Sequence, residues 1–130
     1  MAALSDYAEK LLLDFLMTTG TATRPTNWYV ALYTAAPSDS GGGTEVSAGG
    51  YARQSVSFSA ASSPGGTTSN SGEVSFTASG GDYGTVTHMG IFDAASSGNL
   101  LWHGALTASK TVADGDTLTF AVGNIDLTMA

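Results

Sequence analysis

The chain has no cysteine, few basic residues and no long apolar run. Without cysteine there is no disulfide, no thiolate nucleophile and no Cys-containing zinc site, so the fold must rest on packing. Four basic residues stand against eleven acidic ones, giving a net charge of -7, and no basic stripe is left to bind nucleic acid. The most apolar stretch, LLLDFLM, is short and is interrupted by Asp14, so we expect neither a signal peptide nor a membrane span.

The abundant residues indicate a small β domain. A chain of 130 residues fits one domain, which buries roughly two-thirds of the surface that its unfolded chain exposes. Charged residues make up only 12%, while Gly, Ser and Thr are frequent, unlike the charge-rich composition of disordered segments. We expect a single domain over residues 1–130, with an N-terminal helix within 1–20 and a β-sandwich over 27–130.

One helix is predicted, over the sequence SDYAEKLLLDFLMTT near the N-terminus. Asp6 is placed to cap it, with Glu9 completing a capping box, and Gly20 follows its end. Apolar residues at helical spacing predict a face that packs against the sheet. They are Leu4, Ala8, Leu11, Leu12, Phe15 and Leu16. Leu13 and Met17 fall outside this stripe, so the helix either lies against its own sheet or also contacts a neighbouring subunit.

After residue 27 the apolar pattern changes to a period of two, and strand candidates follow between Gly/Ser-rich breaks. They are WYVALYT (28–34), ARQSVSFS (52–59), GEVSFTA (72–78), TVTHMGIFD (85–93), NLLWHGAL (99–106), DTLTFAVG (116–123) and NIDLTMA (124–130). Two loops remain, 38–50 and 61–72, and loops of this length are usually functional or mobile. This order predicts a mainly β fold, an antiparallel two-sheet sandwich of jelly-roll type with one N-terminal helix.

The alternation within the strands predicts which side chains face inward. They are Val56, Phe58, Val74, Phe76, Leu118, Phe120, Val122, Ile125, Leu127 and Met129. TVTHMGIF differs, because Met89, Ile91 and Phe92 are apolar on both faces, as in a central strand covered on both sides or one near an interface. Gly90 in this strand indicates a close backbone approach or a bulge.

The sequence contains no recognisable set of catalytic residues. His88 and His103 lie on consecutive strand candidates, and a hairpin through AASSGN would place both rings on one face. Neither has a nearby cysteine or a matching carboxylate pattern, so we interpret them as structural. The segment DGD at 114–116 lacks the further ligands of a calcium loop and predicts a turn with Gly115 at positive φ. No serine lies in a GxSxG elbow, and we predict no catalytic, cofactor or metal site.

The aromatic residues allow two interpretations. They are Trp28, Tyr29, Tyr33, Tyr51, Tyr83 and Trp102. Facing outward on a β-sandwich, they would stack on sugars, whereas facing inward they would fill the core or an interface. We favour the core or an interface, because both tryptophans lie within apolar runs.

The segment GGYARQ leads from a long loop into a strand and contains one of the four basic residues. Gly49 and Gly50 allow an unusual backbone path, and Tyr51 supplies a large anchor. Arg53 lies on the face opposite Val56, where it would bridge a carboxylate of an adjacent subunit. We therefore predict that Arg53 is a structural strut. The full predicted assembly interface is Leu13, Met17, Tyr51, Arg53, Met89 and Ile91.

The sequence resembles a family of small phage virion proteins labelled tail fibre or head-associated structural proteins. The resemblance runs from Trp28 to the C-terminus, and its most specific pieces are VALYTAAPSD, TEVSAGGYARQ, GIFDA and LLWHGAL. The family pattern often has a third glycine where this chain has Ala48. The resemblance implies a non-enzymatic structural protein on the exterior of a tailed phage, built on a β-sandwich and acting as an oligomer, a homotrimer.

Its place on the virion stays open between a capsid decoration, or cement, protein and a tail-fibre component. The implied partners are other copies of the chain and virion proteins such as the major capsid or tail proteins, with no nucleic acid, membrane or cofactor. The expected location is the virion, after synthesis in the host cytoplasm. The alternative function is a receptor- or glycan-binding module of the adsorption apparatus.

Overall fold

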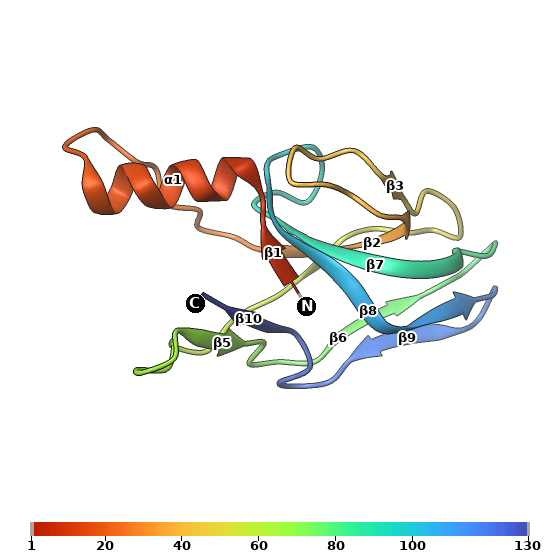
Figure 1. Ribbon diagram of the computed structural model, residues 1–130. Coiled ribbons are helices and arrows are strands. Elements are labelled where there is room, and N and C mark those ends of the chain that lie inside the picture. The colour runs from red at the N-terminus through yellow and green to blue at the C-terminus, as the bar shows by residue number, and fades with distance from the viewer. Residues whose placement is uncertain (1, 130) are drawn as a thin grey trace.

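A computed structural model describes residues 2–129 of the chain. It is mainly β, with antiparallel sheets packed as a sandwich and one helix near the N-terminus (Figure 1). This confirms the predicted fold class, while the jelly-roll type of connection stays a prediction. The elements are β1 (Ala2–Leu4), α1 (Asp6–Met17), β2 (Tyr29–Ala35), β3 (Thr44–Glu45), β4 (Gln54–Ser55), β5 (Thr67–Ser69), β6 (Val74–Thr77), β7 (Gly84–Phe92), β8 (Leu100–Val112), β9 (Thr117–Phe120) and β10 (Asp126–Thr128).

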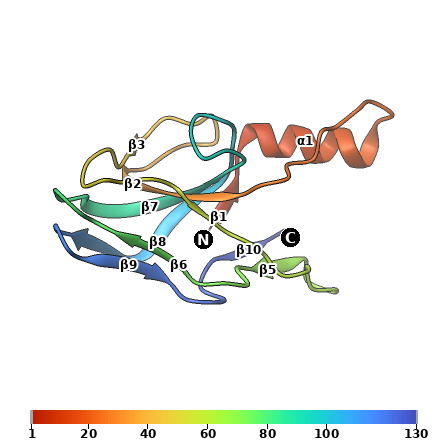
Figure 2. The ribbon, with the colours of Figure 1, turned by 180° about the vertical axis from the view of Figure 1, so that it is seen from behind.

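The larger sheet has the strand order β1-β8-β7-β2-β3, and β4 also pairs with β2. The opposing layer consists of two antiparallel pairs, β5 with β10 and β6 with β9, and both ribbon views show it beneath the large sheet (Figures 1 and 2). The main core lies between the layers. Its most deeply buried members are Val30, Leu32, Phe76, Val86, Ile91 and Val112.

The strand β7 is central in the large sheet, with β2 on one side and β8 on the other. Its inward residues, Met89 and Ile91, are buried in the main core, and Phe92 joins a second, smaller cluster with Ala31, Tyr33 and Leu100. The prediction of a central strand covered on both sides is confirmed. So is the close approach at Gly90, where an added Cβ would lie 2.9 Å from the Leu100 side chain.

The helix α1 begins at Asp6, so its cap lies one residue earlier than predicted. Ser5, not Asp6, is the N-cap, and its hydroxyl oxygen accepts a hydrogen bond from the Ala8 N–H at 3.2 Å. The same hydroxyl donates to the carbonyl of Leu100, and the Ser5 N–H donates to the carbonyl of Leu101 at 2.9 Å. Ser5 is therefore 1% exposed, because it joins the helix to β8 as well as capping it. At the other end the helix stops at Met17 with Thr18 as its C-cap, two residues before the end of the predicted segment at Thr19.

Several predicted strands differ in length from the observed ones. The candidate at 52–59 is reduced to β4, which has two residues, and β8 continues to Val112. The strands β1, β3 and β5 were not predicted, and β3 and β5 lie within the two long loops. Val122 and Met129 were expected inside but are 63% and 48% exposed, because β9 ends at Phe120 and β10 at Thr128. Ala130 of the last candidate lies outside the described residues.

Candidate functional site

Arg53 lies on the outer face of the large sheet, where it joins three segments of its own chain. Its Nε and Nη2 donate to the two carboxylate oxygens of Glu45 at 2.8 and 2.9 Å. Its Nη1 donates to the carbonyl oxygens of Ala94 and Ser97 at 3.0 and 2.8 Å. The guanidinium carbon lies 3.6 Å from the centre of the Phe92 ring, a cation–π contact. Arg53 thereby ties the loop that contains β3 and the loop after β7 to the sheet.

Tyr51 and the glycines before it complete this arrangement, which we call the Arg53 cluster. The Tyr51 hydroxyl donates to Glu45 at 2.7 Å and accepts from the Leu32 N–H at 3.0 Å. The ring of Tyr51 packs between Phe76 and Tyr83 in the core. Gly49 and Gly50 have φ values of +66° and +67°, so the predicted unusual backbone path is confirmed.

The charges of the Arg53 cluster stabilise each other. Burial disfavours the charged form of Glu45, but the hydrogen bonds from Arg53 and Tyr51 outweigh it and lower the pKa of this carboxyl. Burial also disfavours the charge of Arg53, and its bonds to Glu45 again outweigh it and raise the pKa of the guanidinium. Burial, assisted by the charge of Glu45, raises the pKa of Tyr33 to about 12. Near neutral pH Arg53 and Glu45 are therefore both charged and paired, and the neighbouring Tyr33 and Tyr51 are protonated.

These positions correct the expected partner of Arg53 and the expected exposure of three other residues. The carboxylate that binds Arg53 belongs to the same chain, so the prediction of a bridge to an adjacent subunit is wrong in this respect. The side chain of Arg53 is only 9% exposed. Met89 and Ile91 are 6% and 0% exposed, and Tyr51 packs against the same core. These side chains pack and bond within one chain. Their role in assembly stays a prediction.

Leu13 and Met17, the other two predicted interface residues, lie in the second half of α1. The helix extends beyond the sheets (Figures 1 and 2). Leu13 and Met17 are 62% and 75% exposed, and Leu16 is 67% exposed. These three residues, at positions i, i+3 and i+4 of the helix, form one face, and we call them the helix stripe. Phe15, on another face, is 66% exposed. Phe15 and Leu16 were expected to pack on the sheet, but the helix extends past the strands that support its first half.

The histidines lie as predicted on neighbouring strands, and the register of β7 and β8 places both on one face. The His103 Nε2 lies 2.7 Å from the Asp39 carboxylate, and His88 Nδ1 lies 2.9 Å from the Thr87 hydroxyl. Each ring therefore has a local partner, which agrees with a structural role. Within residues 2–129 no three metal-ligating side chains lie together. The predicted turn with Gly115 at positive φ, between β8 and β9, is confirmed.

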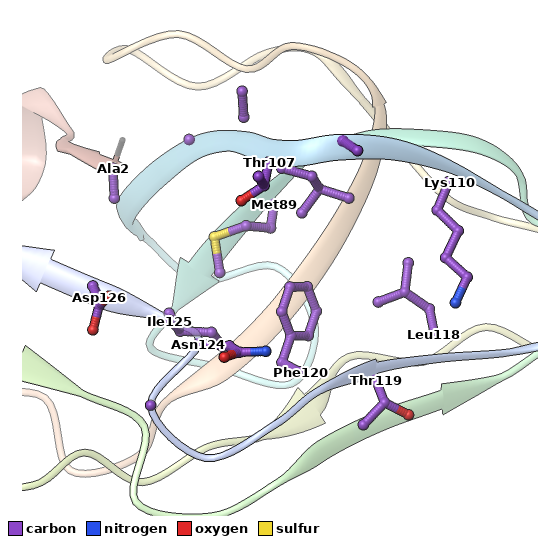
Figure 3. Close-up of a pocket in the computed structure, with 15 residues that line it drawn as sticks. Ala2, Met89, Thr107, Lys110, Leu118, Thr119, Phe120, Asn124, Ile125 and Asp126 are labelled. Carbon is purple, nitrogen blue, oxygen red and sulfur yellow. The ribbon is translucent and has the colours of Figure 1, made fainter.

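Two open clefts indent the surface. One, of about 610 Å³, lies on the outer face beside the Arg53 cluster and the triple glycine of 41–43. The other, of about 550 Å³, lies between β8 and β9, with Ala2 near one end and Lys110 near the other (Figure 3). Met89, Leu118 and Phe120 point into it (Figure 3). Within the described residues every buried side-chain nitrogen and oxygen has a hydrogen-bond partner, so the buried polar groups are already engaged within the chain.

A smaller and more apolar hollow of about 260 Å³ lies between the large sheet and the pair of β5 and β10. We call it the tryptophan hollow. It is lined by Trp28, Phe58, Thr68, Ile91, Leu101, Trp102 and Leu127. Both tryptophans and Phe58 are partly buried and pack against the main core, and Tyr33 and Tyr83 are buried. The burial of these aromatics agrees with the interpretation that they fill the core or an interface.

Comparison with known protein families gives a match over nearly the whole chain. Residues 3–128 match the family described as Podophage GP4 fiber I protein gp80. The chain belongs to this family. It is thus a structural virion component of the tail-fibre type, and its resemblance to phage virion proteins is confirmed. No curated protein matches the chain. In the described part of this fibre-family chain, no helix has the length and apolarity to cross a bilayer.

Sequence reasoning missed two features of the site in this fibre-family chain. Glu45 precedes Arg53 by eight residues, and the paired glycines between them were the signal that the chain turns back on itself. The tryptophan hollow was not predicted, because its lining comes from segments scattered between residues 28 and 127. Apolar aromatics at strand starts indicate burial, but they do not show that space is left beside them.

Proposed function

We propose that this chain is a non-enzymatic structural subunit of a phage tail fibre that acts as a homo-oligomer, a trimer as the resemblance implies. It would be made in the host cytoplasm and would attach in the virion to other tail proteins. The family match supports the fibre role. The observation that carries the assembly role is the exposed end of α1.

Four large apolar side chains at the end of α1 are each about two-thirds exposed, namely Leu13, Phe15, Leu16 and Met17. Fully burying such a side chain stabilises by about 1.5–3 kcal/mol, so covering all four would contribute roughly 4–8 kcal/mol per copy before the costs of association. The nearest charges on the helix, Lys10 and Asp14, pair with each other at 2.5 Å. A second protein surface can therefore cover this end without meeting an unpaired charge of that pair.

Two measurements test this function. Sedimentation equilibrium of the purified chain should give a mass of three copies, and a monomer at all concentrations up to about 100 μM, well above a micromolar Kd, would contradict self-assembly. Immunogold labelling of intact virions should mark the tail. Label on the head surface would contradict the fibre placement and favour a capsid decoration.

A further inference from the structure

We propose that the cleft between β8 and β9 receives an extended peptide segment of another tail protein, which adds to β8 as an antiparallel strand. We call this cleft the edge cleft. The inference rests on the proposed function in one respect, that the chain attaches to other tail proteins. Two features of the cleft recognise such a segment, namely unpaired strand backbone along its walls and opposite charges at its two ends.

The middle of β8 has no strand partner on either side. On one side β1 pairs only with residues 102–104. On the other side β7 pairs with β8 up to Ala105 and again from Lys110, so β8 advances five residues where β7 advances two. Within residues 2–129 no strand pairs with 106–109. A bulge leaves its extra residues unpaired, so the backbone N–H and C=O groups of these residues are available to another strand.

The opposite wall of the edge cleft is also an unpaired strand edge. β9 pairs with β6 in a sheet of two strands, so its other edge has no partner in the described chain. Residues 118–120 of β9 and 104–108 of β8 line the cleft. Edge strands attract other chains, and proteins usually protect them with charges or proline. Residues 105–109, ALTAS, contain neither, so this part of the edge is suited to strand addition.

The floor of the edge cleft is apolar. Met89, Leu118 and Phe120 point into it (Figure 3), and the first two belong to the main core. Successive side chains of a strand point to opposite faces, so apolar residues at alternate positions of the segment would cover this floor. The volume of about 550 Å³ lies within the roughly 300–1,000 Å³ of binding sites. Residues 105–110 offer an edge of about 20 Å, enough for about six extended residues.

The two charges that line the edge cleft lie at its opposite ends and set the direction of the segment. Lys110 is at one end, and Asp126 is at the other, on the side of Ala2 (Figure 3). Both charged residues are exposed, and within the described residues neither forms an ion pair. A segment antiparallel to β8, as β1 is, begins beside Lys110 and ends toward Asp126. An acidic first residue and a basic last residue complement these charges.

The occupant is a different polypeptide and not a second copy of the chain. Within the described residues both terminal strands are already paired, β1 with β8 and β10 with β5. A second copy could supply either strand only by losing these pairs. Two copies with a net charge of -7 each also repel one another. A segment from another protein meets neither obstacle.

Binding of a synthetic peptide to the full chain tests the strand addition. The probe has six residues, with glutamate first, lysine last, valine and threonine alternating between them, and both ends blocked. It should bind with a Kd below about 1 mM and slow the amide hydrogen exchange of residues 106–109 by about 10-fold or more at saturation. A control peptide with proline in place of threonine should not bind, because proline has no N–H to donate.

Charge reversal tests the direction of the segment. Lys110→Glu with Asp126→Lys reverses both ends of the cleft and should weaken binding of the probe about 10-fold, from about 3-fold for each exposed pair. A second probe with its glutamate and lysine exchanged should bind this variant better than it binds the wild type. Lys10→Glu with Asp14→Lys is the matched control, because it reverses the same charges on α1, outside the cleft, and should bind as the wild type. Thermal melts establish that each variant is folded.

Thiol labelling tests whether the edge cleft is occupied in the virion. The chain has no cysteine, so a single introduced thiol reports on its own surroundings. Thr107→Cys lines the cleft at an exposed position. It should react with a maleimide about 10-fold or more slowly in virions than in the purified chain, since reaction requires access to the thiol. Ser75→Cys, exposed on β6 and outside the cleft, should react at the same rate in both.

The outcomes separate this inference from the proposed function. If neither probe binds the wild type, strand addition at this edge is wrong, while a trimeric mass and label on the tail still support the proposed function. Equal reactivity of Thr107→Cys in virions and in the purified chain would show an empty cleft and overturn the inference. Protection of Thr107→Cys already in the purified assembly would show that a second copy fills the cleft, and the different polypeptide would be refuted.

Discussion

Replacing Arg53 by alanine should destabilise the isolated chain and not only its assembly. The substitution removes four hydrogen bonds within the chain and the contact with Phe92. It also leaves the Glu45 carboxylate, 27% exposed, without its cation. The loss therefore falls on the fold itself, because every partner is intramolecular.

The size of the effect follows from the burial of the pair. Removing one partner of a buried ion pair costs about 3–5 kcal/mol. We expect the lower end, about 3 kcal/mol, because Glu45 is partly exposed and keeps the hydrogen bond from Tyr51. For a chain of intermediate length each kcal/mol lowers Tm by roughly 3–5 °C, so Tm should fall by about 10 °C.

Denaturant unfolding followed by tryptophan fluorescence measures this free energy, provided that the samples are diluted until the wild type and the variant are monomeric. Arg53→Lys is the matched control, because lysine keeps the charge but not the forked donors, and it should recover only part of the loss. A double-mutant cycle with Glu45→Ala should give a coupling energy of at least about 1 kcal/mol. A monomer that loses less than about 1 kcal/mol would refute the reasoning and return Arg53 to an interface.

Three further predictions concern pH, backbone conformation and salt. Because the pKa of Glu45 is lowered in the fold from its model-compound value of 4.5, its contribution to stability is present above that value and is lost as pH falls through the lower folded pKa. Glu45→Gln should flatten the unfolding free energy between pH 6 and pH 3, roughly the range that brackets this titration. Gly49→Ala should cost about 2–4 kcal/mol in chemical unfolding, because φ is +66° and the new Cβ would lie 2.6 Å from the carbonyl of Gly81; Gly115→Ala, with nothing within 4 Å of its Cβ, should cost only about 1–2 kcal/mol. Virions washed in roughly 1 M salt, where the Debye length is about 3 Å, should keep the protein on gels, whereas loss of the band would show that charge holds it.

The sequence predicted which strands form and which of their side chains face inward better than it predicted where each strand ends. Alternation located β6 and β9 and the inward positions of Val74, Phe76 and Leu118, since a period of two marks the buried face wherever the partner lies. It failed at Val122 and Met129, where the strands end two residues or one before these positions. An apolar pattern reports that a face is buried while the strand lasts, and it does not report where pairing stops.

For the candidate site, the sequence identified the important residue but could not identify the side chain that it contacts. The sequence singled out Arg53 as a strut, but β3 has only two residues within a glycine-rich loop, and nothing in its pattern places Glu45 opposite the guanidinium. Met89 and Ile91 were recognised as apolar on a two-sided strand, and whether a sheet or another subunit covers such a strand depends on contacts distant in sequence. Spacing separated Leu13 and Met17 from the helix's main stripe, but it did not predict exposure, because Phe15 and Leu16 of that stripe are exposed to the same degree.

Because Ser5 both caps α1 and bonds to β8, the helix is anchored to the sheet at its first turn. The Ser5 hydroxyl bonds to β8 and to the first turn of the helix at once, so the direction of the helix is set at its base. The helix has 12 residues and is about 18 Å long, so a tilt of about 10° at this serine would move the far end by about 3 Å. A single side chain at the base therefore sets the direction of the helix, and with it the position of the exposed apolar side chains at its far end.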